Sequence, residues 1–127
     1  ICEKAVYYMK ENLLIDKSIA FAARIVKLHQ HLITNKKETI ISKQIIRSGT
    51  SIGANANEAA YGVSHADFIS KMQIALKECY ETEYWLELFV KSDILNRESV
   101  VELYNQCGTI RRMLISSINT AKDSLKR

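Results

Sequence analysis

Hydrophobic residues recur every three or four positions along most of this chain, which predicts long amphipathic helices. The first predicted helix begins near Asp16, whose carboxylate can accept hydrogen bonds from first-turn amides, and ends at residues 34–37. It carries two adjacent hydrophobic stripes, and a face of that width is typical of a helical bundle. One stripe contains Phe21, Ile25, Leu28 and Leu32, and the other contains Ile15, Ile19, Ala22, Val26, His29 and Ile33.

We expect residues 1–12 to form a poorly specified N-terminal extension, because they add little to this pattern. The segment Met9-Lys10-Glu11-Asn12 has the form of a native start, which would place residues 1–8 upstream of it. No functional residue is assigned to this extension.

A second helix is predicted over residues 40–61, and small residues interrupt its hydrophobic pattern. A glycine inside a helix costs about 1 kcal/mol relative to alanine, so Gly49 and Gly53, which share one face, require a packing reason. We expect another backbone to approach them closely, either within one subunit or between subunits. A neighbouring face carries Arg47, Ser51, Asn55 and Glu58. That face is either a solvated surface or a partly buried network that fixes helix register.

The turn after the second helix has the strongest local signals in the chain. Ser64, with Asp67 three residues later, has the form of a capping box that starts a third helix. This helix runs to about residue 91, and Glu83 occupies a position where its pattern calls for an apolar residue. A buried unpaired carboxylate is unfavourable, so Glu83 lies at an edge or pairs with a cation such as Arg47.

The second half of the chain completes an all-α pattern. The third helix has more aromatic surface than one bundle core requires, which favours a subunit interface. Its aromatic residues include Tyr80, Tyr84, Trp85 and Phe89. A fourth helix is predicted from Asn96, its N-cap, with one hydrophobic stripe along most of its length.

The composition agrees with a single domain spanning residues 1–127. The chain has no proline and only four glycines, so it offers few turn positions and favours long helices. No apolar run approaches the roughly 20 residues needed to span a bilayer, so we expect a cytoplasmic protein with no membrane partner. Cys2, Cys79 and Cys107 are odd in number and widely spaced, which indicates free thiols, buried in the last two cases.

Charge is distributed unevenly between the predicted helices. The formal net charge of +4 permits acidic partners such as nucleic acid. Acidic residues outnumber basic ones in residues 65–91, whereas basic residues outnumber acidic ones in residues 96–127. A basic face on the fourth helix would attract phosphates, although basic residues near a helix end also favour the helix dipole.

Catalytic and metal-binding patterns are weak. His29 and His31 are two residues apart and point to different sides of a helix, which does not suit joint metal ligation. The Glu-x-x-His pairs of di-iron bundles are missing, and residues 48–53 lack the lysine of a P-loop. We interpret Glu78, Glu81, Glu83 and Glu87 as a solvated face. We therefore expect no enzymatic activity, no cofactor and no metal site.

Four segments carry a family pattern: Ser42–Asn55 (SKQIIRSGTSIGAN), Asn57-Glu58-Ala59, Asp67–Met72 (DFISKM) and Glu81–Leu86 (ETEYWL). With them, residues 13–125 or thereabouts resemble the bacterial four-helix bundle family, also called the S23 ribosomal protein family, encoded in intervening sequences of 23S ribosomal RNA genes. The chain is also similar to the accessory variability determinant of diversity-generating retroelements. The resemblance implies an antiparallel up-down-up-down four-helix bundle, a homopentamer, a basic surface that binds nucleic acid and, in retroelements, a reverse transcriptase partner.

Charge and resemblance together predict a non-enzymatic, oligomeric bundle that binds RNA or DNA through a basic surface with little sequence specificity. The cations expected to contact phosphates are Arg24, Lys27, Lys36, Lys37, Arg111, Arg112, Lys122 and Lys126. The residues expected to form a structural polar network are Arg47, Asn55, Glu58 and Glu83. The alternative function is a protein-interaction scaffold or an accessory subunit, for example for a reverse transcriptase, without direct nucleic-acid binding.

Overall fold

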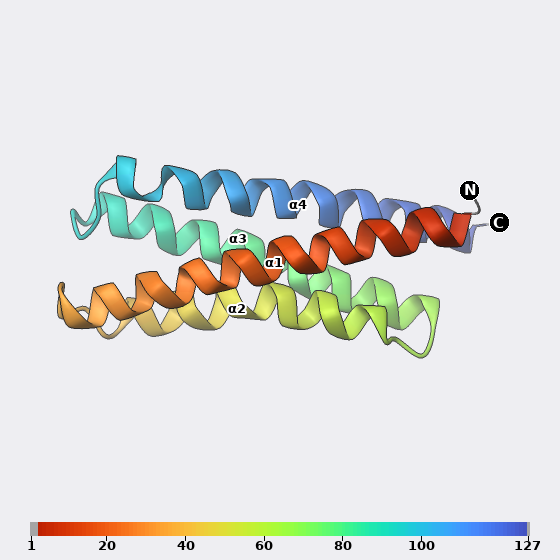
Figure 1. Ribbon diagram of the computed structural model, residues 1–127, viewed down its shortest axis with the longest axis horizontal. Coiled ribbons are helices and arrows are strands. Elements are labelled where there is room, and N and C mark those ends of the chain that lie inside the picture. The colour runs from red at the N-terminus through yellow and green to blue at the C-terminus, as the bar shows by residue number, and fades with distance from the viewer. Residues whose placement is uncertain (1–2, 127) are drawn as a thin grey trace.

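The computed structural model describes residues 3–126, with side chains from residue 12 onward. This part of the chain forms four helices: α1 (Glu3–Thr34), α2 (Ile41–Ala60), α3 (His65–Lys91) and α4 (Arg97–Leu125). Each helix packs against the next, and α4 closes the bundle against α1 (Figure 1). The start of α1 and the end of α4 lie at one end, and the α1–α2 and α3–α4 turns lie at the other. The predicted all-α, up-down-up-down four-helix bundle is confirmed.

The first helix is longer than predicted. α1 begins at Glu3, so Asp16 lies in its interior, and the expected helix start at Asp16 is wrong. The physical reason is that residues 3–16 contain neither glycine nor proline, so nothing in them stops a helix. Cys2 and the side chains of residues 3–11 lie outside the described residues, so the assignment of residues 1–8 to an upstream segment stays a prediction.

Side-chain caps start α3 and α4 where predicted. Ser64 Oγ accepts a hydrogen bond from the Asp67 amide at 3.0 Å, and Asn96 Oδ1 accepts one from the Ser99 amide at 2.8 Å. At the start of α2, the carboxylate of Glu38 accepts hydrogen bonds from two amides, at 3.2 and 2.8 Å. Each cap satisfies amides that a helix start leaves unpaired, which fixes where the helix begins.

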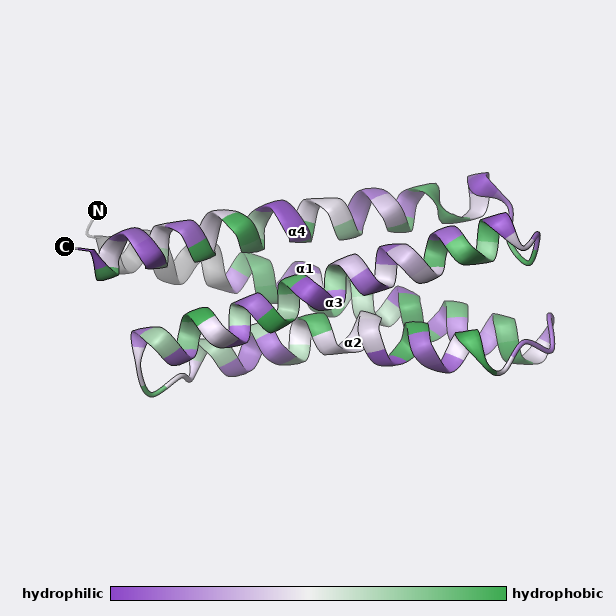
Figure 2. Ribbon diagram, turned by 180° about the vertical axis from the view of Figure 1, so that it is seen from behind, coloured by the Kyte–Doolittle hydropathy of each residue, from purple (hydrophilic) through white to green (hydrophobic). Residues whose placement is uncertain are grey.

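The core is a continuous layer of aliphatic and aromatic side chains between the four helices. Hydrophobic and hydrophilic residues alternate along the described part of every helix in Figure 2, as expected for helices with one buried face. The largest fully buried side chains include Leu14, Phe21, Ile52, Met72 and Phe89. Because these come from α1, α2 and α3, and Ile110 and Leu114 of α4 join them, one core holds all four helices.

α1 and α2 approach each other closely at two glycines. A Cβ added to Gly49 would lie 2.8 Å from Ile25 Cγ2, and one added to Gly53 would lie 3.1 Å from Ser18 Cβ. Both glycines are buried. They therefore serve packing within one subunit, which decides between the two alternatives that their spacing allows.

Candidate nucleic-acid interface

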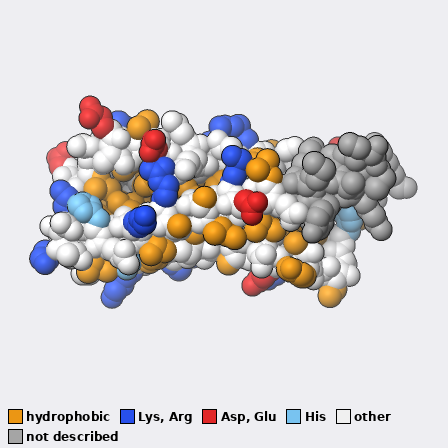
Figure 3. Space-filling model, in the orientation of Figure 1, with side chains coloured by type: hydrophobic (Ala, Val, Ile, Leu, Met, Phe, Trp, Pro, Cys, Tyr) orange, Lys and Arg blue, Asp and Glu red, His pale blue; other side chains and the backbone are white. Residues whose placement is uncertain are grey.

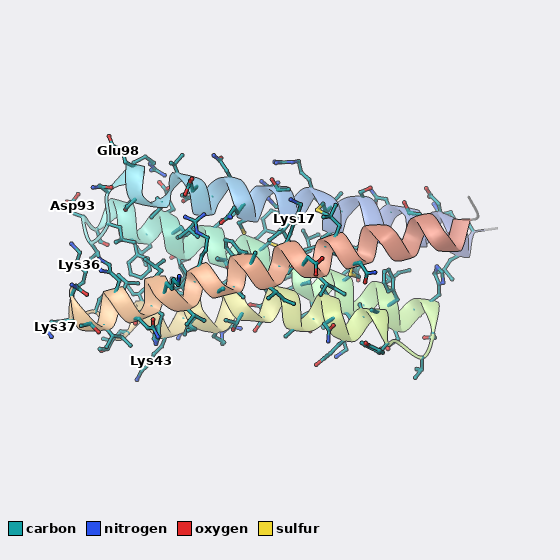
Figure 4. The ribbon with its side chains drawn as sticks, in the orientation of Figure 1. Lys17, Lys36, Lys37, Lys43, Asp93 and Glu98 are labelled. Atoms are coloured by element: carbon teal, nitrogen blue, oxygen red, sulfur yellow. The ribbon has the colours of Figure 1, made fainter. Side chains whose placement is uncertain are left out.

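The cations predicted to contact phosphates do not form one patch. Lys36 and Lys37 lie in the turn between α1 and α2, at the end of the bundle where two acidic side chains are also labelled in Figure 4. Lys122 and Lys126 lie at the end of α4, near the opposite end of the bundle. A helix rises about 1.5 Å per residue, so these two pairs are separated by roughly 40 Å. One short nucleic-acid segment does not reach all of them.

Two of the predicted cations are held by ion pairs between helices. Arg24 of α1 donates to Glu102 Oε2 of α4 at 2.8 Å. Arg111 of α4 donates from Nε to Glu83 Oε1 at 2.8 Å, and its guanidinium carbon lies 5.8 Å from the ring centroid of Tyr80. Arg24 therefore helps to close α1 against α4, whereas Arg111 hydrogen-bonds its carboxylate through Nε.

The other predicted cations face solvent. They are Lys27, Lys36, Lys37, Arg112, Lys122 and Lys126. Among the described residues none of them takes part in an ion pair. These side chains are free to contact an anion.

Arg47 and Glu83 do not pair with each other. Arg47 of α2 forms ion pairs with Glu78, at 3.2 Å, and with Glu81 of α3. Glu83 lies on the side of α3 that faces α4, where it pairs with Arg111. Arg47 and Glu83, two of the four residues of the predicted polar network, therefore each hold neighbouring helices together. Arg47 joins α2 to α3, and Glu83 joins α3 to α4.

Asn55 and Glu58 also lack a common network. Glu58 pairs with Lys71 of α3 at 2.9 Å, and Asn55 Nδ2 donates to the carbonyl of Ser51, one turn earlier in α2, at 2.8 Å. The predicted network is thus a set of separate contacts, most of which join α3 to a neighbouring helix.

The acidic residues in the second half of α3 are not the solvated face that the sequence pattern indicates. All are partly buried and each pairs with an arginine of α2 or α4: Glu78 and Glu81 with Arg47, Glu83 with Arg111, and Glu87 with Arg97. The uneven charge of the helices is therefore largely balanced inside the molecule. Less of it faces solvent than the residue counts imply.

The part of α4 that borders α3 holds a feature that the sequence pattern did not single out. A Cβ added to Gly108 would lie 3.3 Å from Arg112 Nη1 and 3.4 Å from Arg111 Nη2. The two guanidinium groups thus come together over a residue that has no side chain. The signal available in the sequence was a glycine followed by two arginines in a helix, and it becomes informative only once the arginine rotamers are known.

Two tyrosines of α3 are more than half exposed, and the first of them adjoins Arg111. Tyr80 is 53% exposed and Tyr84, one turn later, is 60% exposed. The Trp85 ring packs edge-on against Tyr84, with ring centroids 5.0 Å apart. The excess aromatic surface expected for this helix is therefore present at these two positions, whereas Phe89 is buried in the core.

A hydrophobic stripe of α1 also faces solvent. Ile19, Val26 and Ile33 are spaced seven residues apart and are 61%, 37% and 36% exposed. Figure 3 shows hydrophobic side chains in a row along α1 on the side toward α2. These three residues belong to the second of the two stripes that the sequence predicts, whose other members, Ile15, Ala22 and His29, are partly buried.

The two described cysteines are buried free thiols, as predicted. Cys107 Sγ lies 3.5 Å from the carbonyl oxygen of Cys79, to which it donates a hydrogen bond. Hydrogen bonding to Cys79 and burial both raise the pKa of the Cys107 thiol, so it stays protonated and is a poor nucleophile.

Within the described residues, no cluster of three or more His, Cys, Asp or Glu side chains could hold a metal ion. A cleft of about 180 Å³ lies between α1 and α4, lined by Lys17, Ala20, Gln106, Thr109 and Ile110. The residues that line this cleft include no histidine and no carboxylate.

No described helix combines the length and apolarity required to cross a membrane.

These features define an antiparallel four-helix bundle whose helices are joined by interhelical ion pairs. The chain belongs to the 23S rRNA-intervening sequence protein family, whose pattern matches residues 10–116. It is 51% identical to a protein with unknown function from the S23 ribosomal protein family of Bacteroides thetaiotaomicron, known from a crystal structure. That match covers 87% of this chain and 98% of the other, with a TM-score of 0.85. A search of curated proteins gave no match.

The comparisons confirm the resemblance to this family. The further similarity to the accessory variability determinant of diversity-generating retroelements stays a prediction.

Proposed function

We propose that this protein is a non-enzymatic, homo-oligomeric bundle that acts in the cytoplasm and binds RNA or DNA with little sequence specificity. The observation that carries the proposal is the set of exposed, unpaired cations on α1, α4 and the α1–α2 turn. They are Lys27, Lys36, Lys37, Arg112, Lys122 and Lys126. Cations of this kind attract phosphates whatever the base sequence, and a sequence pI of about 9.0 keeps the protein positively charged at neutral pH.

Self-association is supported by the exposed stripe of α1. Ile19, Val26 and Ile33 lie on a side of the helix where the neighbouring positions, Ala22, Ala23 and Gln30, are also uncharged. Uncharged apolar surface of this extent is typical of a protein interface. A second copy of the chain covers it in our proposal, and the expected assembly is the homopentamer that the family resemblance implies.

Salt-titrated binding tests the nucleic-acid proposal. We expect the protein to bind duplex DNA and structured RNA at low salt, with an affinity that falls as salt rises. A triple variant, Arg112→Glu with Lys122→Glu and Lys126→Glu, should bind much more weakly. A matched variant, Lys43→Glu, changes an exposed lysine of α2 outside the proposed set and should bind nearly as well as the wild type. Absence of binding at low salt would contradict the proposal.

The alternative is a protein-interaction scaffold or an accessory subunit, for example for a reverse transcriptase, without direct nucleic-acid binding. The exposed rings of Tyr80 and Tyr84 favour it, because tyrosine is enriched at protein interfaces. A protein that forms a stable oligomer but binds neither RNA nor DNA at low salt would support this alternative.

A further inference from the structure

Two positive charges come together on α4 at its boundary with α3, and among the described residues one carboxylate, that of Glu83, pairs with them. One terminal nitrogen of Arg111 and one of Arg112 both lie within 3.4 Å of the position that a Gly108 Cβ would take. Glu83 contacts Arg111 through Nε, and the partner of Arg112 is the neutral hydroxyl of Thr109, at 3.3 Å. Paired guanidinium groups present several N–H donors to one anion, and their planar geometry suits phosphate oxygens.

Exposed aromatic rings lie beside these arginines. The Arg111 guanidinium carbon is 5.8 Å from the Tyr80 ring centroid, so the first tyrosine adjoins the arginine pair directly. Tyr84 follows four residues later, about 6 Å along the helix axis. The edge of Trp85 packs against Tyr84, which limits the motion of that ring. Exposed rings beside cations are the arrangement on which unpaired nucleic-acid bases stack.

The charges around the tyrosines favour a negatively charged strand. The carboxylates beside this face are already paired: Glu83 and Glu87 with arginines of α4, and Glu81, on the side of α2, with Arg47. Lys77, three residues before Tyr80, and Lys91, seven residues after Tyr84, lie on the same outer face of α3. Both lysines are exposed, and within the described residues neither is in an ion pair. The outermost strip of α3 therefore has two rings with an exposed lysine on either side.

The exposed rings of Tyr80 and Tyr84 favour single-stranded over double-stranded nucleic acid. In a duplex the faces of the bases are stacked on one another, so a protein ring on an open helix surface cannot reach them. Unpaired bases are available for stacking, while their phosphates are available to the arginines. We propose that the α3–α4 face binds a single-stranded segment of RNA or DNA, with a phosphate at Arg111 and Arg112 and bases stacked on Tyr80 and Tyr84. This inference rests on the proposed function and adds the form of nucleic acid and the side chains that select it.

Fluorescence anisotropy with labelled oligonucleotides tests the tyrosines. The probes are an oligouridine, an oligothymidine and a duplex of equal length, so that RNA, DNA and double-stranded binding are measured separately. Tyr80→Leu and Tyr84→Leu should each weaken binding to the single strands at least about fivefold, the lower end of base–aromatic stacking, and leave duplex binding unchanged. Tyr84→Phe should retain binding because the ring remains. The control is Tyr61→Leu, which alters another exposed tyrosine, in the α2–α3 turn.

A second pair of variants tests the arginines. Gly108→Ala places a methyl group 3.3 Å from Arg112 Nη1 and 3.4 Å from Arg111 Nη2, so it should shift these flexible ends by a few tenths of an ångström and weaken single-strand binding slightly without unfolding the helix. Arg112→Gln should lower the slope of log affinity against log salt by about 0.7, the value for one phosphate contact on a single strand. Lys43→Gln is the charge-matched control and should leave the slope unchanged.

The outcomes separate this site from the proposed function. If the wild type binds single strands no better than duplexes, or if the leucine variants bind single strands normally, the single-strand site is wrong and the proposed function stands. If no probe binds at low salt, both fail. If Tyr80→Leu or Tyr84→Leu changes the mass of the particle in light scattering, the face is an interface between copies and the site is also wrong.

Discussion

Gly49 sets the distance between α1 and α2. The position that its Cβ would occupy lies 2.8 Å from Ile25 Cγ2 and 2.9 Å from Ile25 Cγ1, and Ile25 is fully buried. We expect Gly49→Ala to lower the free energy of unfolding by about 1–3 kcal/mol, because the overpacking outweighs the gain in helix propensity. Urea unfolding followed by circular dichroism measures the change.

Gly108 provides the matched control for this prediction. The same substitution there meets only the ends of arginine side chains, which can move aside. Gly108→Ala should therefore keep full stability or gain up to about 1 kcal/mol from helix propensity. A Gly49→Ala variant as stable as Gly108→Ala would show that α1 and α2 are not held at the close distance that the structure shows.

A buried hydroxyl pair joins α2 to α3. Thr82 Oγ1 and Ser48 Oγ are 2.9 Å apart, and both residues are fully buried. We expect Thr82→Val to destabilise the protein by about 1–2 kcal/mol, because it removes one of the two hydrogen-bond partners of the buried Ser48 hydroxyl. The double variant with Ser48→Ala should cost less than the sum of the single variants. Additive effects in urea unfolding would mean that the two hydroxyls do not interact.

At the scale of the helices, α3 and α4 are joined next to their connecting turn by a cluster around Glu87. Arg97 donates two hydrogen bonds to this carboxylate, at 2.8 and 3.0 Å, and the Tyr104 hydroxyl donates a third at 2.7 Å. These hydrogen bonds, that of Arg97 first, lower the pKa of Glu87 to about 2. The same cluster raises the pKa of Tyr104 to about 12, chiefly through burial and then through the bond to Glu87.

The lowered pKa makes the contribution of Glu87 dependent on pH. Its pKa in the folded protein lies below the usual 4.5, so its stabilisation is complete above pH 4.5 and is lost as the pH falls toward 2. Glu87→Gln should be less stable than the wild type at pH 7, and the difference should shrink as the pH falls through this range. Urea unfolding at several pH values measures it. Glu98→Gln, at an exposed glutamate of α4, is the control, and a difference for Glu87→Gln that did not vary with pH would contradict the assignment.

The helix starts were predictable, whereas the partners of charged side chains were not. Ser64 and Asn96 could be recognised as caps because the amide that each one binds lies three residues along the chain. The partners of Arg47 and Glu83 depend on how each helix is rotated about its axis and on side-chain rotamers. The spacing of residues along one helix determines neither the rotation of the helix nor the rotamers. The pairing of Glu83 with Arg111 was therefore seen only in the folded protein.

The candidate site shows the same limit. Exposure of most of the predicted lysines followed from their place at helix ends and on polar faces, where burial would leave a charge unpaired. The arginines differ because a long planar group reaches across to neighbouring helices, as Arg24 reaches Glu102. The approach of Arg111 and Arg112 to Gly108 could not be predicted from the sequence, because two successive helical residues ordinarily point about 100° apart.

At the scale of the whole molecule, some charged side chains pair with each other and hold the bundle together, while others face solvent and can bind a partner. Arg97 of α4 balances Glu87 of α3 and so stabilises the helix contact, whereas Arg111 pairs with Glu83 through Nε and also belongs to the proposed phosphate site. Lys122 and Lys126 have no such partner among the described residues and add to the charge that faces solvent. A solvent-facing charge that is spread over the length of the bundle suits contact with an extended polyanion, in which phosphates recur at regular intervals.

The exposed stripe of α1 gives the prediction for assembly. A glutamate at position 19 or 26 would have to be buried, unpaired, in an interface formed by that stripe, so Ile19→Glu and Val26→Glu should split the oligomer into smaller particles. Circular dichroism should show unchanged helix content, because both positions face solvent in the single chain. His31→Glu is the control: His31 is exposed and lies about 140° around α1 from Val26.

Size exclusion with light scattering measures the mass of the oligomer, and the wild type should have the mass of five chains.

Assembly also multiplies the number of cations that one nucleic acid can contact at once, so splitting the oligomer should weaken binding to long strands through loss of multivalency. Binding to a strand short enough for one subunit should not change. A wild-type monomer, or an Ile19→Glu variant with unaltered mass, would mean that the stripe does not hold copies together, and the cations of each chain would then act alone.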